Sequence, residues 1–146
     1  MPSDLTHTLF QAKRAKGLTF QTLADEVGCD PVFLAAVFHG QASTTPEQAQ
    51  KLVDTLDLDA SLATELTRYP LKGGNTPTIP ADPFLYRFHE ILEVYGAALK
   101  DVVQESFGDG IMSAVDFTLH VEREHDPKGD RVKITMNGKF LPYRRW

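Results

Sequence analysis

An arginine and a glutamate stand three residues apart inside an apolar stretch of the sequence, YRFHEILEVYG (residues 86–96). Residues at this spacing are neighbours on a helix, so Arg87 and Glu90 can form a surface ion pair worth roughly 0.2–0.5 kcal/mol. They can instead belong to a site, because the planar guanidinium of arginine suits the oxygens of small anions. The spacing alone favours the surface pair and leaves the site open.

A glycine-rich stretch, FGDGIMSAVDF (residues 107–117), supplies a second set of groups that can do chemistry. Glycine-rich turns expose backbone N–H groups that can cradle an anion, and Ser113 adds a hydroxyl. No histidine stands beside Ser113 as an obvious base, which argues against an acyl-serine mechanism. Turns of the Gly-Asp-Gly kind are common, so this stretch alone is a weak sign of a site.

Arg87 and Glu90 fall on a predicted helix that begins at Asp82-Pro83 and ends in the glycines of residues 107–110. Its apolar residues recur three and four apart, which is the spacing of a buried helical face. The charged pair flanks a second, smaller apolar side. A helix needs a second apolar side if it packs against two neighbours, and a cleft between subunits would then hold the pair; the spacing alone still favours a surface pair. The main apolar face consists of Phe84, Phe88, Ile91, Leu92, Tyr95, Leu99, Val102 and Val103.

Beyond this helix the apolar residues alternate with polar ones, which is the period of a β-strand with one buried face. The pattern predicts a strand, a loop at residues 126–130, a second strand and a tight turn at Asn137-Gly138. A sheet of two or three strands is barely stable alone, so we expect a partner subunit to complete it. The residues predicted to face inward are Val115, Phe117, Leu119 and Val121, then Val132, Ile134 and Met136.

Residues 1–69 are predicted to form a series of short helices. Thr19, Asp30-Pro31 and Thr45-Pro46 are typical helix starts, because the side-chain oxygen caps free N–H groups and proline tolerates the first helical position. Residues 70–80, PLKGGNTPTIP, form the predicted linker. We therefore expect an α+β fold: a helical bundle in residues 1–75, then a long helix and a small β-sheet in residues 76–146.

Residues 18–40, LTFQTLADEVGCDPVFLAAVFHG, have the look of a helix-turn-helix. This raises an alternative function, a DNA-binding regulator with a C-terminal dimerisation module. Bases and phosphates are contacted mainly by Arg, Lys, Asn and Gln. No Lys or Arg lies between Lys16 and Lys51, and the net charge of the chain is −5. We therefore expect no nucleic-acid binding and a helix-turn-helix-like topology that serves packing.

Other features of the 146-residue sequence restrict the class of protein. The single cysteine, Cys29, excludes an intrachain disulfide and has no cation beside it, so a passive thiol is expected. The N-terminus lacks a secretion signal, and no stretch approaches the roughly 20 apolar residues of a membrane span. A cytoplasmic location is expected, with no membrane association. The five histidines show no metal-ligand spacing, so no metal site is predicted.

Beyond these patterns, the sequence resembles the cyanase family, also called cyanate hydratase or cyanate lyase. The resemblance is carried by residues 80–117, PADPFLYRFHEILEVYGAALKDVVQESFGDGIMSAVDF, and by the ending GKFLPYRRW, and it extends across nearly the whole chain. It implies a reaction in which cyanate and bicarbonate give carbamate and carbon dioxide, after which carbamate falls apart to ammonia and a second carbon dioxide. It implies no metal and no organic cofactor. Detoxification of cyanate and nitrogen supply are both compatible with it.

The resemblance also implies the site and the assembly. The family's catalytic residues are an arginine, a glutamate three residues later, and a serine in the glycine-rich segment, which fall here on Arg87, Glu90 and Ser113. Family members form decamers of five dimers with active sites between subunits, so residues 76–146 are expected to be the catalytic and dimerisation domain. This chain departs from some members in lacking a cysteine in the linker, and in having His89 where an aromatic residue is frequent.

We expect distinct roles for the three residues. Arg87 is expected to hold the two anions, with copies from neighbouring subunits sharing the site. Ser113 is expected to donate hydrogen bonds to the charge that develops on the adduct. Glu90 is expected to orient Arg87 rather than to move a proton, because a free carboxylate near two anions is costly.

Overall fold

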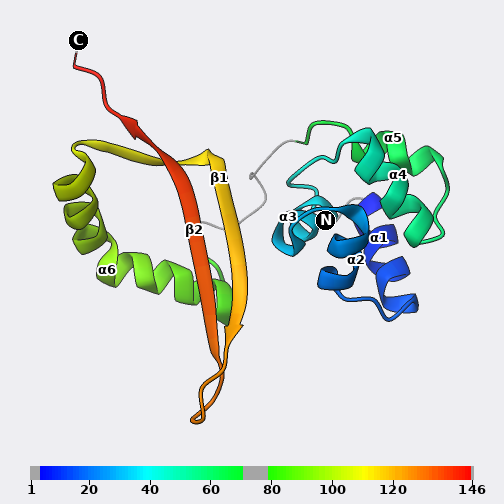
Figure 1. The fold of residues 1–146 in the computed structure, drawn as a ribbon, viewed down its shortest axis with the longest axis horizontal. Helices are drawn as coiled ribbons and strands as arrows, with labels where there is room; N and C mark the ends of the chain where they lie inside the picture. Colours follow the sequence, from blue (N-terminus) through cyan, green and yellow to red (C-terminus); the bar gives the residue numbers. More distant parts are fainter. Residues whose placement is uncertain (1–3, 71–78, 146) are drawn as a thin grey trace. The chain divides into compact units, whose positions relative to one another are not determined.

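The computed structural model describes residues 4–70 and 79–145, and within them the chain has the predicted α+β composition. The described residues divide into two compact units. One takes residues up to 70 together with residues 120–133, and the other takes residues 79–119 together with 134–145. The predicted boundary between residues 75 and 76, and nearly all of the predicted linker, lie outside the described residues. The elements, coloured along the chain in Figure 1, are α1 (Asp4–Ala15), α2 (Phe20–Val27), α3 (Pro31–Phe38), α4 (Pro46–Thr55), α5 (Ser61–Leu66), α6 (Pro83–Phe107), β1 (Gly110–Glu124) and β2 (Arg131–Pro142).

The predicted helix starts of the first unit are confirmed. Thr19 Oγ1 accepts a hydrogen bond of 3.0 Å from the N–H of Thr22, and Asp30 Oδ1 accepts one of 2.7 Å from Val32. Thr45 and Gln48 form a reciprocal capping box at the start of α4. These side chains satisfy N–H groups that have no partner inside their own helix, so α2, α3 and α4 begin where the sequence predicts.

The apolar core lies among α1 to α5. Phe38 is fully buried, and its ring meets those of Phe10 and Phe20 edge to face, with centroids 5.3 and 5.1 Å apart. This core is what fixes the five short helices against one another, since single helices of this length are marginal in water. The buried apolar residues are Leu9, Leu23, Ala24, Val27, Leu34, Val37, Phe38, Ala49, Leu52, Val53, Leu56 and Leu66.

Helix α6 follows the predicted bounds but lacks the burial that its sequence predicts. Asp82 caps it by accepting hydrogen bonds of 2.9 and 3.0 Å from the N–H groups of Phe84 and Leu85, and Gly108 ends it. None of its 25 residues is buried, and the main apolar face stays largely open along its length. The described residues therefore leave most of the apolar face of α6 uncovered. None of the described helices has the length and apolar character that a membrane span requires.

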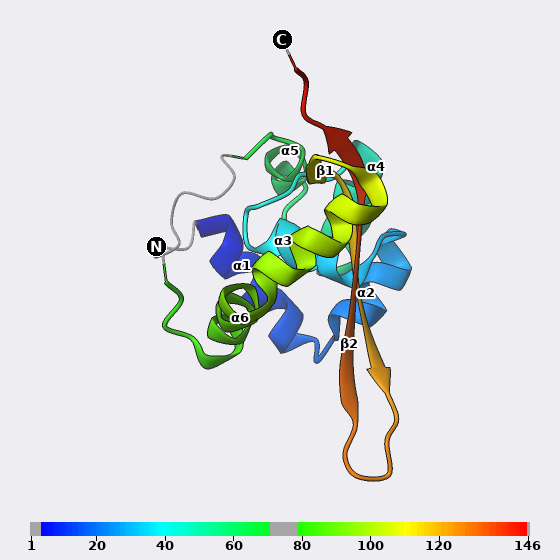
Figure 2. The same cartoon turned by 90° about the vertical axis from the view of Figure 1, so that its left-hand side faces the viewer.

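The strands β1 and β2 pair as a two-stranded antiparallel sheet, and they lie side by side in both views (Figures 1 and 2). The turn between them falls at the predicted loop, where Asp126 accepts hydrogen bonds from the N–H groups of Lys128 and Gly129. The prediction of a tight turn at Asn137-Gly138 is wrong, because both residues lie inside β2. The loop at residues 126–130 already reverses the chain, so the second pair of turn residues continues the strand.

The predicted alternation of β1 holds only in part. Phe117, Leu119 and Ile134 are half-buried, but Val115 is 96% exposed. Val121, Val132 and Met136 are exposed too, so these four predicted inward positions are wrong within the single chain. At Val115 a local contact is present: Ser113 Oγ accepts hydrogen bonds from the N–H groups of Val115 and Asp116. A serine that binds the backbone two and three residues ahead bends the chain, and the bend interrupts the alternation.

The core predicts a contrast between two phenylalanines of α3. Phe38→Ala should lower the free energy of unfolding by about 3–5 kcal/mol, because it leaves a cavity among packed rings. Phe33→Ala, in the same helix at 40% exposure, should cost less than about 1.5 kcal/mol. Urea denaturation followed by circular dichroism at one fixed protein concentration measures both. Equal losses for the two variants would contradict the position of the core.

Candidate active site

Arg87 and Glu90 form the predicted pair on α6, and in the single chain it is an exposed pair. Arg87 Nη1 lies 3.7 Å from Glu90 Oε2, with the side chains 62% and 52% exposed. The guanidinium also lies over the ring of Tyr86, 5.8 Å from its centroid. A guanidinium has five N–H donors, and one long contact to a carboxylate leaves most of them available to another anion.

Ser113 is the one buried member of the predicted trio, at 6% exposure. Its Oγ accepts hydrogen bonds of 3.0 Å from the N–H of Val115 and 2.9 Å from that of Asp116. A hydroxyl oxygen has two lone pairs, and both are used here. No acceptor for its proton is found among the described residues, so the hydroxyl is held as a donor with a fixed direction. The sequence pattern did not reveal this arrangement, although serine hydroxyls are able to bind the backbone two residues ahead.

The glycine-rich segment before Ser113 has mainly structural duties. The N–H of Gly108 donates to Gln104 O at 2.9 Å and so completes the end of α6. The side chain of Asp109 accepts from Gln104 Nε2 at 3.2 Å, and its carbonyl accepts from the N–H of Tyr143 at 3.0 Å. The amide of Gly108 is thus not free for an anion, which limits the cradle that the sequence suggested.

Along one chain, Arg87 and Ser113 are separated by most of the length of α6. Twenty residues of helix separate Arg87 from Phe107, which is roughly 30 Å at 1.5 Å per residue. The six residues from Phe107 to Ser113 span at most about 22 Å. Their Cα atoms therefore stay at least roughly 8 Å apart even if the chain folded straight back. No hydrogen bond or ion pair joins Ser113 to Arg87 or Glu90 in the described part of the chain.

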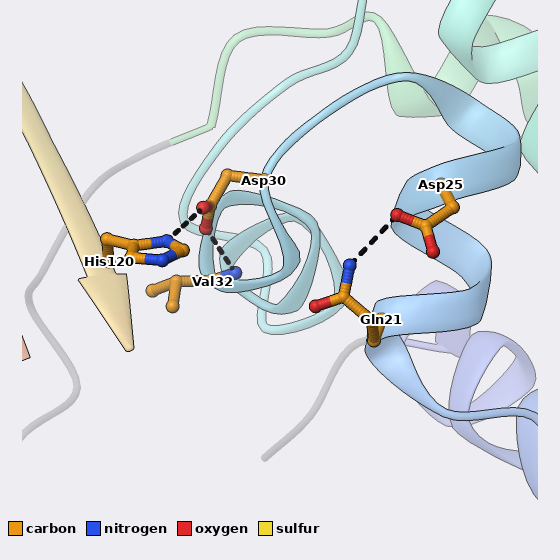
Figure 3. A network of polar contacts seen from close by, with 5 residues as sticks. All are labelled: Gln21, Asp25, Asp30, Val32 and His120. Carbon is orange, nitrogen blue, oxygen red and sulfur yellow. Dashed lines mark hydrogen bonds and ion pairs between the residues drawn. The ribbon is translucent and has the colours of Figure 1, made fainter. Parts of the chain in front are cut away.

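The polar contacts at the start of α3 are relevant to the alternative function, DNA binding. Figure 3 shows Asp30 capping α3 through Val32 while its other oxygen lies 3.1 Å from His120 Nδ1. In the same view Gln21, on α2, donates to Asp25 at 2.9 Å. The end of α3 that would face a phosphate backbone thus carries a carboxylate. A carboxylate at this position repels phosphate, and the absence of nucleic-acid binding stays a prediction.

Cys29 and the metal-binding side chains add no second site. Burial, and then the neighbouring Asp30, raise the pKa of the Cys29 thiol, so it stays protonated at neutral pH, as expected of a passive thiol. Across residues 4–70 and 79–145, no three His, Cys, Asp or Glu side chains lie close enough together to hold a metal ion.

Comparison with known proteins matches both halves of the chain. A family model described as cyanate hydratase, N-terminal, matches residues 3–70, and one described as cyanate lyase C-terminal domain matches residues 77–145. A cyanate hydratase of Synechococcus elongatus is 57% identical over 146 residues, covering both chains fully. One from Nostoc is 58% identical over 143 residues, or 98% of this chain and 97% of the relative.

A solved structure is also similar along nearly the whole chain. The crystal structure of cyanase from T. urticae matches with a TM-score of 0.85 and 40% sequence identity, covering 94% of this chain and 96% of that one. The chain is therefore similar to this cyanase in fold as well as in sequence.

Proposed function

The chain belongs to the cyanate hydratase family, and we propose that it decomposes cyanate in a reaction with bicarbonate. Cyanate, bicarbonate and one proton give carbamate and carbon dioxide, and carbamate with a second proton gives ammonia and carbon dioxide. The proposal rests above all on the 57% identity with cyanate hydratases over the full length of both chains. Each turnover consumes two protons and releases one ammonia and two carbon dioxide molecules.

We assign Arg87 the task of bringing the two anions together. Two like charges repel each other more strongly in a site from which water is excluded, so a fixed cation is needed. The exposed donors of the Arg87 guanidinium suit the oxygens of bicarbonate and the ends of cyanate. Glu90, 3.7 Å away on the same helix face, orients the guanidinium. With both reactants held, much of the rate gain comes from proximity.

Ser113 stabilises the charge that forms when bicarbonate attacks the carbon of cyanate. Its oxygen accepts from two N–H donors, which leaves its proton to donate to the oxygen or nitrogen of the adduct. Bicarbonate is itself the nucleophile, and the serine therefore needs no base. This geometry supports donation by Ser113 rather than attack by it.

We propose that the site is shared between subunits. No described contact joins Arg87 to Ser113 within one chain, and the family resemblance implies that the arginine working with a given serine comes from a neighbouring chain. The open apolar face of α6 and the two-stranded sheet provide surface for that neighbour to cover, and the sheet is completed by it. The assembly is the decamer of five dimers that the family resemblance implies.

No cofactor is proposed, because each step of the reaction needs only charge stabilisation and proton transfer. The helix-turn-helix-like pair α2 and α3 is assigned to packing, since the start of α3 carries Asp30 and no cation. We place the enzyme in the cytoplasm, where a protein with one free cysteine keeps its thiol reduced.

The function is tested by the release of ammonia from cyanate by the purified protein. We expect ammonia with bicarbonate present and a rate near background after bicarbonate is removed by degassing at low pH and re-neutralisation under nitrogen. Dialysis against a chelator should leave the rate unchanged. Equal consumption of cyanate without bicarbonate would disprove the two-substrate reaction, and no ammonia under any condition would disprove the function.

Arg87→Leu should lower the rate of ammonia release by roughly 100-fold or more, because it removes the cation that holds the anions. Arg68→Leu is the matched control. Arg68 pairs with Glu65 at 3.0 Å and the same spacing of three residues, so the variant removes an equal charge and an equal ion pair elsewhere. Its rate should stay within about twofold. Full activity of Arg87→Leu would refute the assignment.

Leu99→Glu should break the assembly, because burying a carboxylate on the apolar face of α6 costs several kcal/mol. Lys100→Glu adds a carboxylate one residue further, about 100° around the helix, and should leave the assembly intact. Light scattering should find about 163 kDa, ten times 16.3 kDa, for the wild type and the control. It should find a smaller, inactive species for Leu99→Glu, and an unchanged mass would show that this face is not the interface.

A further inference from the structure

Gly138 lies in β2 directly against the backbone of Ser113. A Cβ atom at this position would lie 2.5 Å from Met112 Cγ, 3.2 Å from Phe117 Cδ2, and closer still to the carbonyl oxygen of Ser113. Real Cβ atoms essentially never approach other atoms below 3.0 Å. The strand therefore passes Ser113 at a distance that only glycine permits.

The reason for glycine here is space and not backbone conformation. Gly138 is not among the glycines with positive φ, whereas Gly129 in the hairpin turn has φ +128°. The Asn137-Gly138 pair, which looks like a turn in the sequence, thus serves a different purpose within the strand. It allows β2 to press on the residue that carries the buried hydroxyl.

The contact between residue 138 and the Ser113 backbone can affect the Ser113 hydroxyl, because both groups belong to the same residue. A methyl group at residue 138 would push on the Ser113 carbonyl, which is backbone and has little room to yield. The Oγ of the same residue is fixed by the N–H groups of Val115 and Asp116. A shift of the Ser113 backbone therefore either breaks these two hydrogen bonds or turns the hydroxyl proton away from its target.

We propose that Gly138 is a positioning residue for Ser113: the close approach of β2 sets the direction in which the serine hydroxyl donates. This inference rests on the proposed function. It assigns to Gly138 no contact with substrate, only control over a group that has one. Small displacements of a donor matter, since a misplacement of about 1 Å can cost roughly 100-fold in rate.

The test is Gly138→Ala in the full-length protein, assayed for ammonia release from cyanate and bicarbonate. We expect kcat to fall between about 10- and 100-fold, while KM for both substrates stays within about twofold, because the anions are held by Arg87. Gly129→Ala is the control: it strains the turn of the same hairpin, with open space around it, and should keep kcat within about twofold.

A double-mutant cycle separates positioning from general damage to the fold. If Gly138 acts through Ser113, adding Gly138→Ala to Ser113→Ala should lower kcat by less than about twofold further. Gly129→Ala should have the same effect with and without the serine. Where Ser113→Ala is too slow to measure, the split between kcat and KM decides. A wild-type kcat for Gly138→Ala, or a loss that multiplies fully with Ser113→Ala, would overturn the proposal.

If Gly138→Ala fails to fold, a second variant, Gly138→Ala with Met112→Ala, is tested. It removes the clash with Met112 and leaves the clash with the Ser113 carbonyl and the tight contact with Phe117. We expect this variant to fold and to remain slow. Recovery of wild-type kcat would show that the crowding acts through Met112, and failure to fold would make Gly138 a residue of the fold alone; both outcomes overturn the proposal. An inactive wild type would instead refute the proposed function.

Discussion

The part of the chain that carries Arg87, Glu90 and Ser113 buries no apolar side chain of its own in the described structure. Its one buried residue is Ser113, whereas the helices α1 to α5 enclose a complete core. An amphipathic helix of 25 residues gains most of its stability from packing its apolar face. The proposed neighbouring subunit therefore supplies stability to the long helix as well as residues to the site.

The same constraint explains why the candidate site looks incomplete in one chain. Arg87 stands near the start of α6 and Ser113 just beyond its end, so the rigidity of the helix separates them. Neither the exposed Arg87–Glu90 pair nor the Ser113 hydroxyl, which has no acceptor among the described residues, forms a site by itself. In the proposed assembly, where they come from different chains, they would supply a cation and a hydrogen-bond donor for two small anions. Covering α6 and completing the site would then be one event, so loss of assembly would remove activity even with all three residues intact.

The sequence predicted local features well where the cause was local. Thr19, Asp30 and Asp82 cap their helices where the side-chain oxygens and the following residues predicted helix starts. The helical part of the α+β class could therefore be predicted from the sequence. Arg87 and Glu90 were predicted as neighbours, yet their spacing cannot show whether another chain covers them. Their proposed role came from the family resemblance and awaits the rate measurements. The turn predicted at Asn137-Gly138 was wrong because glycine occurs both in turns and at close backbone contacts. Only the position of the paired strand shows which of the two applies.

Three departures from a regular hairpin concern the same few atoms. The outward turn of Val115, the buried Oγ of Ser113 and the close approach of Gly138 all follow from one bend in β1 and the strand that presses on it. A regular strand would carry a freely rotating serine, which must be ordered each time it donates to substrate. In the proposed mechanism, the two amides and the opposing glycine order it in advance, so the donor would need no reorganisation when charge develops. Irregularity at this point of the sheet is therefore what the proposed chemistry requires, and a straighter strand would hold the same serine to less effect.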